Sequence, residues 1–237
     1  MKKVIIGLFL IGIVACIGCI TVPDSNTGVL VIGMENSAKY GSCPGARIDA
    51  NRMAELLGKY GKVTKLQDSQ ATRANVQSAL ARVAAKDMTI IYYSGHGGQQ
   101  GHGDKSETDG KDEFLCLWDG PMLDNELWAV ISSAKRTMLI IDACHSETMY
   151  RSLDTMAKAA RIAGGQNDFL CWAGCADSQY SYGDTSGGKF TNAIRRHYAP
   201  YFTYEQVWKE IEKDKWVNAV QTPKQTKVGN WGGWIFR

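Results

Sequence analysis

Two residues that each follow an apolar segment could form a nucleophilic pair. His96 comes shortly after Met88–Tyr93, and Cys144 comes shortly after Met138–Ile141. A free thiol has a pKa of about 8.5, so only a few per cent is thiolate at pH 7. An adjacent imidazole that accepts the thiol proton makes the sulfur an effective nucleophile, and it can later protonate the leaving group. The residue types therefore predict thiol-based acyl transfer, provided that the fold brings the two side chains together.

The elements that would position this pair follow from the hydrophobic pattern. Apolar runs suited to buried strands alternate with segments at helical spacing. The expected strands are Val29–Gly33, Val63–Leu66, Met88–Tyr93, Met138–Ile141, Phe169–Ala173 and a last one within Asn230–Phe236. The expected helices are Arg47–Lys59, Thr72–Lys86, Leu127–Ile131, Thr191–His197 and Tyr204–Trp216.

Strands that alternate with helices imply right-handed crossovers and a mainly parallel sheet, so the fold class is α/β. Ligands bind such sheets outside the carboxyl ends of the strands. His96 and Cys144 each lie just beyond a strand end, so we expect both at the same edge of the sheet.

Composition excludes several classes of protein. The chain has 237 residues, with 27 Lys and Arg against 24 Asp and Glu, which gives a net charge of +3. This length suits one domain plus a targeting segment, and this charge does not indicate a nucleic-acid partner. Seven cysteines are too few for a disulfide scaffold of this length. No pattern predicts the oligomeric state.

The first residues are typical of an export signal. Lys2 and Lys3 precede the apolar run Val4–Ala15. The residues directly before Cys16 resemble a bacterial lipoprotein cleavage box, in which that cysteine is lipidated, and a poorer box ends at Cys19. The alternatives are an uncleaved membrane anchor and simple secretion.

Each of these alternatives places the folded part outside the cytoplasm. We therefore expect residues 1–18 to be a signal or anchor, residues 19–27 a linker, and residues 28–237 one domain. The predicted location is exported and membrane-associated through a lipid or anchor, or else secreted or periplasmic.

Several motifs carry a resemblance to a known family. Tyr93–Gly98 and Asp142–Ser146 resemble the two catalytic motifs of metacaspases and caspase-like peptidases. His96 precedes Cys144 by 48 residues, close to the interval of about 50 quoted for caspases. Three further segments resemble the family's loops and a helix start, namely Cys43–Ala50, Ala173–Ser181 and Gly188–Thr191. The resemblance covers about Val29 to His197, in the same order.

The resemblance implies a caspase-like three-layer sandwich, with helices on both sides of a mainly parallel sheet. It also implies that Cys144 is the nucleophile and His96 the general acid and base. The backbone N–H groups of Gly97 and Cys144 would form an oxyanion hole, which can contribute several kcal/mol. No third orienting residue is evident, so a dyad is expected.

The resemblance further implies cleavage after Arg or Lys, because metacaspases place carboxylates in the first specificity pocket. The matching substrate-binding residues are Asp49, Ser94, Asp142 and Asp177. The alternative is structural, with Asp142 capping a strand end and Asp49 a helix start.

Calcium is a further implication. Asp109–Glu113 resembles the family's acidic loop, which makes Asp109 and Asp112 candidate ligands for Ca²⁺. However, Arg151 stands where one family ligand would lie, and the acids lack EF-hand spacing. A solvated acidic loop is the alternative.

The leading hypothesis is an exported cysteine endopeptidase that acts on peptides or proteins with a basic residue at the cleavage site. A catalytically silent caspase-like binding or scaffold domain is the alternative, and a Cys/His metal site is a third interpretation. The remaining cysteines could pair or stay free, namely Cys43, Cys116, Cys171 and Cys175.

Overall fold

The computed structural model describes residues 26–101, 111–144, 146–165, 167–176, 179, 181 and 183–231, with the main chain only at 111, 147, 148, 150 and 151. Four of the candidate site residues named above lie outside this part of the chain, namely Cys16, Cys19, Asp109 and Asp177. The roles expected for them stay predictions.

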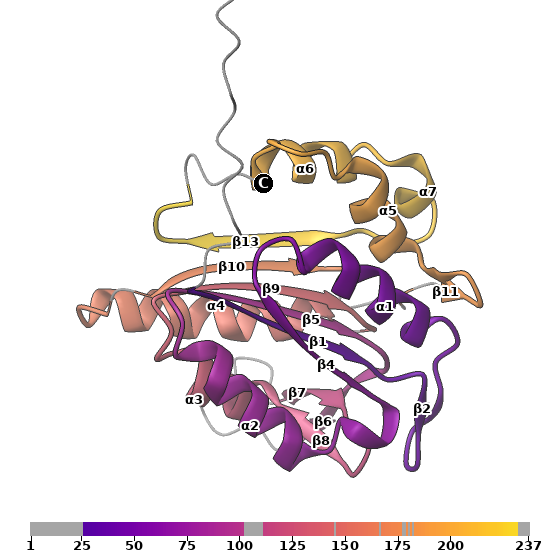
Figure 1. Ribbon diagram of the computed structural model, residues 1–237, viewed down its shortest axis with the longest axis horizontal. Helices are drawn as coiled ribbons and strands as arrows, with labels where there is room; N and C mark the ends of the chain where they lie inside the picture. Colours follow the sequence, from indigo (N-terminus) through magenta and orange to yellow (C-terminus); the bar gives the residue numbers. More distant parts are fainter. Residues whose placement is uncertain are drawn as a thin grey trace, which may run out of the picture.

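The centre of the molecule is a six-stranded sheet in the order β13-β10-β9-β5-β1-β4 (Figure 1). Neighbouring strands are parallel except at β13, which runs antiparallel to β10. The strands are β1 (Thr27–Gly33), β4 (Lys62–Gln67), β5 (Met88–Ser94), β9 (Arg136–Asp142), β10 (Asp168–Ala173) and β13 (Lys224–Val228). The predicted mainly parallel sheet is confirmed.

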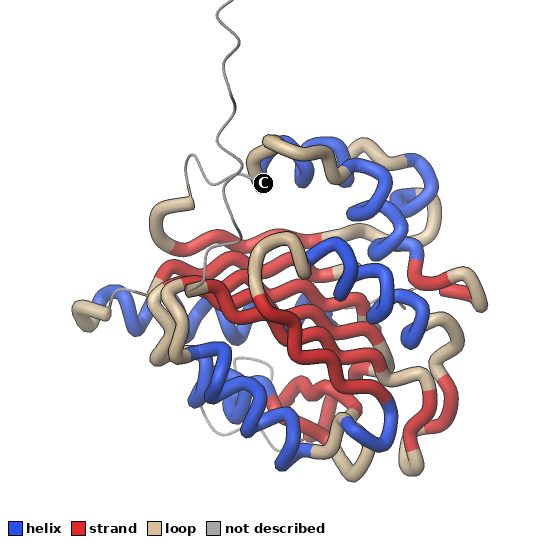
Figure 2. Tube along the Cα trace, in the orientation of Figure 1, coloured by secondary structure: helices blue, strands red, loops and turns tan. Residues whose placement is uncertain are grey.

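Helices cover both faces of this sheet (Figures 1 and 2). One face carries α1 (Ala46–Leu57), α5 (Lys189–His197), α6 (Tyr204–Ile211) and α7 (Lys215–Asn218). The other carries α2 (Arg73–Ala84), α3 (Asp124–Ile131) and α4 (Ser146–Ile162). No helix in the part of the chain described here is long and apolar enough to span a bilayer.

The alternation of side chains along the strands separates two apolar cores. Val29 and Val31 of β1 pack with Met53 of α1 and Trp208 of α6. The residues between and after them, such as Leu30, point to the opposite core with α2, α3 and α4. Because successive residues of a strand face opposite sides of a sheet, a continuous apolar run feeds both layers. The three-layer sandwich follows from this pattern.

Short strands surround the carboxyl edge of the sheet. They form a hairpin of β2 (Asn36–Ser37) and β3 (Gly41–Ser42), a three-stranded sheet of β6 (Gly97–Gly101), β7 (Lys111–Cys116) and β8 (Pro121–Leu123), and a pair of β11 (Gly183–Asp184) and β12 (Gly187–Gly188). A 3₁₀ turn, η1 (Asp68–Gln70), follows β4.

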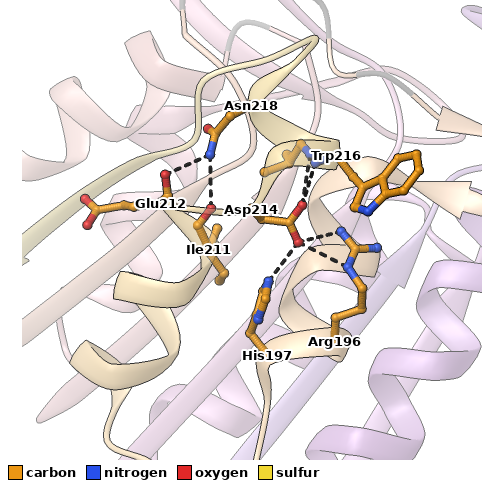
Figure 3. A network of polar contacts seen from close by, with 8 residues as sticks. Arg196, His197, Ile211, Glu212, Asp214, Trp216 and Asn218 are labelled. Atoms are coloured by element: carbon orange, nitrogen blue, oxygen red, sulfur yellow. Dashed lines mark hydrogen bonds and ion pairs between the residues drawn. The ribbon is translucent and has the colours of Figure 1, made fainter.

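The helix expected over Tyr204–Trp216 is in fact two helices. The side chain of Asp214 accepts hydrogen bonds from the N–H groups of Trp216 at 2.8 Å and Val217 at 3.2 Å, so it caps α7. The same carboxylate accepts from Arg196 at 2.6 Å and His197 at 2.8 Å (Figure 3). The Asp214 carboxylate therefore starts a separate helix, α7, and links it to α5.

Two further elements differ from the expectation. The 17-residue helix α4 follows the nucleophile position and was not predicted, although its buried Met149, Leu153 and Ala157 recur every four residues. β13, the last strand among the described residues, precedes the strand expected within Asn230–Phe236 and was not predicted. Asn230 and Trp231 follow β13 without strand structure, and the rest of that segment lies outside the described residues.

Candidate active site

The ends of two neighbouring strands bring the candidate residues together. Ser94 of β5 and Asp142 of β9 are register partners, and the Gly95 N–H donates to the Asp142 carbonyl at 3.3 Å. His96 and Cys144 each lie two residues beyond these partners. The structure therefore places them at the same edge of the sheet, as strand ends in parallel sheets require.

Both side chains line one cavity of about 80 Å³. Three of the expected substrate-binding residues, Asp49, Ser94 and Asp142, line the same cavity. Its wall is completed by Cys43, Pro44, Ala46, Gly95, Ser181, Gly183 and Gly188. Segments far apart in sequence thus converge on a single site.

The orientation of His96 is set by a main-chain atom. Nε2 of His96 lies 3.0 Å from the carbonyl oxygen of Ser42 in β3. Because a carbonyl only accepts, Nε2 carries the proton, and Nδ1 of the neutral ring is left as the basic nitrogen. No sequence pattern indicates this third orienting group, since a backbone carbonyl leaves no residue signature.

The Cys144 thiol is half-buried. Burial raises its pKa, the N–H of Ser181 opposes this effect, and the negative charge of Asp142 adds to it. The net shift is upward, so the resting side chain is a neutral thiol at pH 7. Ionisation at this site therefore needs a base to accept the proton.

The backbone of Gly97 lies directly against that of Cys144. A Cβ added at Gly97 would stand 2.5 Å from the Cys144 carbonyl oxygen and 3.3 Å from the Ala143 side chain. Only a residue without a side chain permits this approach. The two main chains expected to supply an oxyanion hole are thus adjacent.

Asp49 and Asp142 are both buried at the base of the cavity. Oδ2 of Asp49 accepts from the Gly188 N–H at 2.8 Å and from the Ser94 hydroxyl at 3.2 Å. Oδ2 of Asp142 accepts from the N–H and hydroxyl of Thr191 at 3.0 and 2.7 Å. Oδ1 of Asp142 accepts from the Ser181 hydroxyl.

The same contacts test the alternative that Asp49 and Asp142 have structural roles. Gly188 is the N-cap of α5 and Thr191 lies in its first turn, so both carboxylates bind the N-terminus of that helix. Asp49 does not cap its own helix, because the N-cap of α1 is Gly45 and no side chain caps that end. The acids are therefore structural ligands of α5 and cavity residues at once.

Burial of two carboxylates in one place raises the pKa of both. Burial and the charge of Asp142 raise the pKa of Asp49 to about 7. Burial also raises the pKa of Asp142, opposed by its hydrogen bonds from Ser181 and Thr191. Oδ1 of Asp49 is buried and has no hydrogen-bond partner among the described residues. The pocket therefore holds an acceptor and negative charge that a cation would stabilise.

Two residues that support Asp142 were missed by the sequence reasoning. Thr191 was noted only as part of a helix start, yet its hydroxyl also lies 2.6 Å from the Tyr92 hydroxyl. Since the Thr191 proton goes to Asp142, the Tyr92 hydroxyl is the donor to Thr191. Tyr92 is fully buried on β5, so periodicity identified it only as a core residue.

The described part of the chain shows no calcium site, and of the two expected ligands only Asp112 lies within it. Asp112 lies buried in β7, where burial raises the pKa of the nearby Asp124 and the Asp112 charge adds to the shift. No group of three or more His, Cys, Asp or Glu side chains suited to a metal occurs among the described residues. The carboxylates of Asp112 and Asp124 alone fall short of the six to eight oxygen ligands of Ca²⁺.

The described cysteines are free thiols: Cys43, Cys116, Cys144, Cys171 and Cys175. Cys43 shares the cavity with Cys144. Burial is the main cause that raises the pKa of Cys43 and Cys116 to about 12, and neighbouring negative groups add to it. Both are protonated at neutral pH.

Curated metacaspases are similar to this chain in sequence. Metacaspase-3 of Arabidopsis thaliana is 25% identical over 210 residues, which is 73% of this chain and 58% of that protein. Metacaspase-1 of Pyricularia oryzae is 30% identical over 142 residues, which is 50% of this chain and 36% of that protein. The chain spans less than two thirds of the length of these curated relatives.

Solved structures agree on the fold. Protein GSU0716 from Geobacter sulfurreducens superposes with a TM-score of 0.68 at 26% identity, over 86% of this chain and 94% of that chain. Caspase-1 from Spodoptera frugiperda superposes with a TM-score of 0.59 at 13% identity, over 85% and 86% of the two chains. A family model described as Caspase domain matches residues 27–215. This chain belongs to the caspase domain family.

Proposed function

We propose that the chain is a cysteine endopeptidase that hydrolyses peptide bonds after Arg or Lys. The observation that carries the proposal is one cavity that holds a thiol, an imidazole and two buried carboxylates, namely Cys144, His96, Asp49 and Asp142. Membership of the caspase domain family supports a cysteine peptidase at the level of the family.

Proton transfer begins the reaction. The Ser42 carbonyl holds the proton on Nε2 of His96, so Nδ1 is the nitrogen that accepts the Cys144 proton. The sulfur then attacks the carbonyl carbon of the substrate, and the imidazolium returns the proton to the leaving amine. Water attacks the resulting thioester with His96 as base, which releases the acid and restores the thiol.

The negative oxygen that forms during each attack needs donors already in place. The adjacent main chains of Gly97 and Cys144 supply N–H groups for it. Loss of such a donor in other acyl-transfer enzymes costs roughly 10²- to 10³-fold in kcat.

Specificity comes from charge at the base of the cavity. A guanidinium or ammonium group that enters would neutralise the Asp49 and Asp142 pair and bind the buried Oδ1 of Asp49. An acidic or apolar side chain would leave that oxygen buried without a partner, which costs about 1–3 kcal/mol, and a neutral amide would leave the negative charge of the pair uncompensated.

The test compares matched fluorogenic peptides that differ only at the residue before the scissile bond. The peptides carry Arg, Lys, Gln or Asp there, and each is assayed with Ca²⁺ and with a chelator. The expected order is Arg or Lys far above Gln and Asp, with no hydrolysis by Cys144→Ala. Equal signals from wild type and Cys144→Ala would overturn the peptidase proposal.

The silent caspase-like domain remains the second candidate because burial keeps the Cys144 thiol protonated at rest. A silent domain would bind the Arg peptide without turnover. Retained binding with no cleavage by the wild-type protein, with and without Ca²⁺, would favour this candidate.

We further propose that the folded part is exported and held at a membrane through its first residues. The basic start, the apolar run Val4–Ala15 and the cysteines that follow support this. Mass spectrometry of protein from a membrane fraction would detect a lipidated N-terminal Cys16, or Cys19 if the second box is used. An intact Met1 with a membrane-bound chain would instead indicate an uncleaved anchor.

A further inference from the structure

We infer that the edge of the sheet opposite the active site docks on an anionic phospholipid surface. This inference rests on the proposed membrane tether and adds an orientation to it. The surface in question, here called the basic edge, consists of the amino-terminal ends of the parallel strands and the helix ends and loops beside them.

Strand register defines this edge. Thr27 pairs with Met88, Gly28 with Lys62, and Arg136 with Asp168, so the starts of five strands lie together. The active-site residues lie at the other ends of β5 and β9. In Figure 1 the arrows of the parallel strands run from the basic edge toward the hairpin of β2 and the pair that contains β11, and β13 runs the opposite way.

Cations outnumber acids at the basic edge. The cationic residues are Lys59, Lys62, Arg82, Lys86, Lys135, Arg136 and Arg161, and the acids are Glu55, Asp87 and Asp168. Asp87 pairs with Lys135, and Asp168 pairs with Arg136 at 2.8 Å and Arg161 at 2.9 Å. Within the described part of the chain, Lys62 and Lys86 form no ion pair and are exposed. Positive charge thus remains on this surface after internal pairing.

An exposed apolar side chain lies at the same edge. Ile162 ends α4 with 89% of its surface exposed, and the next three residues, Ala163, Gly164 and Gly165, are also exposed. The end of α4 extends past the strand starts in Figure 1. Helix C-termini attract cations, which accounts for Arg82 and Arg161. That effect gives no reason to expose an isoleucine, whereas insertion between lipid headgroups does.

A cavity beside Ile162 suits a headgroup phosphate. It measures about 480 Å³ and is lined by Arg136, Arg161, Gly164, Gly165, Asp168 and Asn230. The Arg161 side chain is 46% exposed and reaches Asp168 through Nη1, so its other N–H groups can meet a phosphate oxygen.

The position of Asn26 favours a membrane as the partner of the basic edge. The Asn26 carbonyl accepts from the Asp87 N–H at 3.0 Å, so residue 26 lies at the basic edge. A lipid on Cys16 would leave nine residues before Asn26, which span at most about 30 Å. A tether this short keeps the basic edge near the bilayer, where each cation contributes about five-fold to association with anionic lipid. The active site then faces away from the membrane.

The experiment measures hydrogen exchange of the full chain reconstituted into vesicles. One set contains phosphatidylcholine alone, and the other contains phosphatidylcholine with 30 mole per cent phosphatidylglycerol. We expect residues 158–165 to exchange about five-fold or more slowly in the anionic vesicles only, and 0.5 M NaCl to abolish the difference. Residues 215–221 provide an internal reference, because Trp216 is 71% exposed and Gln221 binds the Gly174 carbonyl at 2.7 Å, at the carboxyl edge.

Two variants, each with a matched control, test whether the exposed isoleucine and the unpaired lysines of the basic edge cause the protection. Ile162→Ser and the double change Lys62→Glu with Lys86→Glu should each remove the protection, while hydrolysis of a soluble Arg peptide stays unchanged. Trp216→Ser and Lys215→Glu are the controls, because they make the same apolar-to-serine and lysine-to-glutamate changes away from the basic edge. Both should leave the protection intact.

The possible outcomes distinguish the docking from the proposed tether and from the proposed reaction. A chain that never sediments with vesicles overturns both the tether and the docking. A chain that sediments but shows equal exchange in the two vesicle types overturns the docking alone. Protection of residues 158–165 by a short DNA duplex but not by anionic vesicles also overturns it. Peptidase activity is read separately and decides only the proposed reaction.

Discussion

The Ser42 carbonyl oxygen lies 3.0 Å from Nε2 of His96, a residue 54 positions further along the chain. The hairpin of β2 and β3 therefore fixes which imidazole nitrogen is basic. The contact involves a main-chain atom, so the conformation of the hairpin controls it, and the side chain at position 42 does not.

Gly41→Val is expected to lower kcat about ten-fold or more. Gly41 precedes Ser42 and has a φ of 81°, a conformation that costs a β-branched residue about 1–3 kcal/mol. Relief of this strain would move the Ser42 carbonyl away from His96. Steady-state kinetics on an Arg peptide provide the measurement, with circular dichroism to verify the fold.

Ser42→Ala is the matched control, because it retains the carbonyl and removes only the side chain. Its kcat should stay within about two-fold of wild type. A large loss with Ser42→Ala, or none with Gly41→Val, would contradict the role assigned to the carbonyl.

Gly97→Ala is expected to lower kcat by about 10²-fold with little change in KM. The added Cβ would stand 2.5 Å from the Cys144 carbonyl oxygen and must push β6 away from the nucleophile. The N–H groups around the reacting carbonyl would then separate. Gly101→Ala at the other end of β6 meets no atom within 4 Å and serves as the control. Equal kinetics for the two variants would argue against this account.

Binding of a basic side chain should strengthen as pH rises through about 7. The pKa of Asp49 is raised to about 7, mainly by burial and then by Asp142, so its ionised fraction grows from about one-tenth at pH 6 to about nine-tenths at pH 8. Calorimetry with the Cys144→Ala protein and an Arg peptide should show an affinity gain of about ten-fold, with proton release near pH 6. Asp49→Asn should bind more weakly and without this pH dependence.

The same shift predicts how stability changes with pH. The folded chain holds the Asp49 proton between about pH 4 and pH 7, whereas the unfolded chain has already released it. The free energy of unfolding contributed by this group therefore falls as pH rises through that window. Urea titrations at pH 5 and pH 7.5 should show a smaller difference for Asp49→Asn than for wild type. An unchanged difference would place the pH dependence elsewhere.

Thr191→Val should raise KM for Arg peptides several-fold and leave kcat nearly unchanged. The variant removes the hydroxyl that donates to Asp142 at 2.7 Å and leaves the Tyr92 hydroxyl without its partner. Loss of that hydrogen bond raises the pKa of Asp142 further, which weakens attraction for a cation. Thr191→Ser keeps the hydroxyl and should restore most of the affinity. A failure of Thr191→Ser to rescue would indicate a packing effect instead.

The sequence predicted the central strands because they are continuous apolar runs with both faces buried. It also predicted that His96 and Cys144 share an edge, since each follows such a strand. Helix α4 has a signal of its own in Met149, Leu153 and Ala157, which are apolar and four positions apart. β13 is an edge strand rich in polar residues, and the Gly- and Gln-rich β6 has no apolar alternation, so neither had a clear pattern.

The site was predictable where side chains carry the chemistry or where a family motif contains the main-chain groups, as at Gly97 and Cys144. The acids at positions 49 and 142 were found, but the main-chain atoms that they bind at Gly188 and Thr191 were not. Such contacts depend on how the N-terminus of α5 packs against two strand ends. That packing is a property of the folded molecule rather than of any local pattern.

The central claim is that Cys144 attacks a peptide bond that follows a basic residue. The most direct measurement is single-turnover mass spectrometry of the protein with an Arg peptide that is quenched in acid. A thioester is expected on the tryptic peptide that contains Cys144, absent from Cys144→Ala and strongly reduced when Gln replaces Arg. Cleavage of the Arg peptide by Cys144→Ala at the wild-type rate would contradict it.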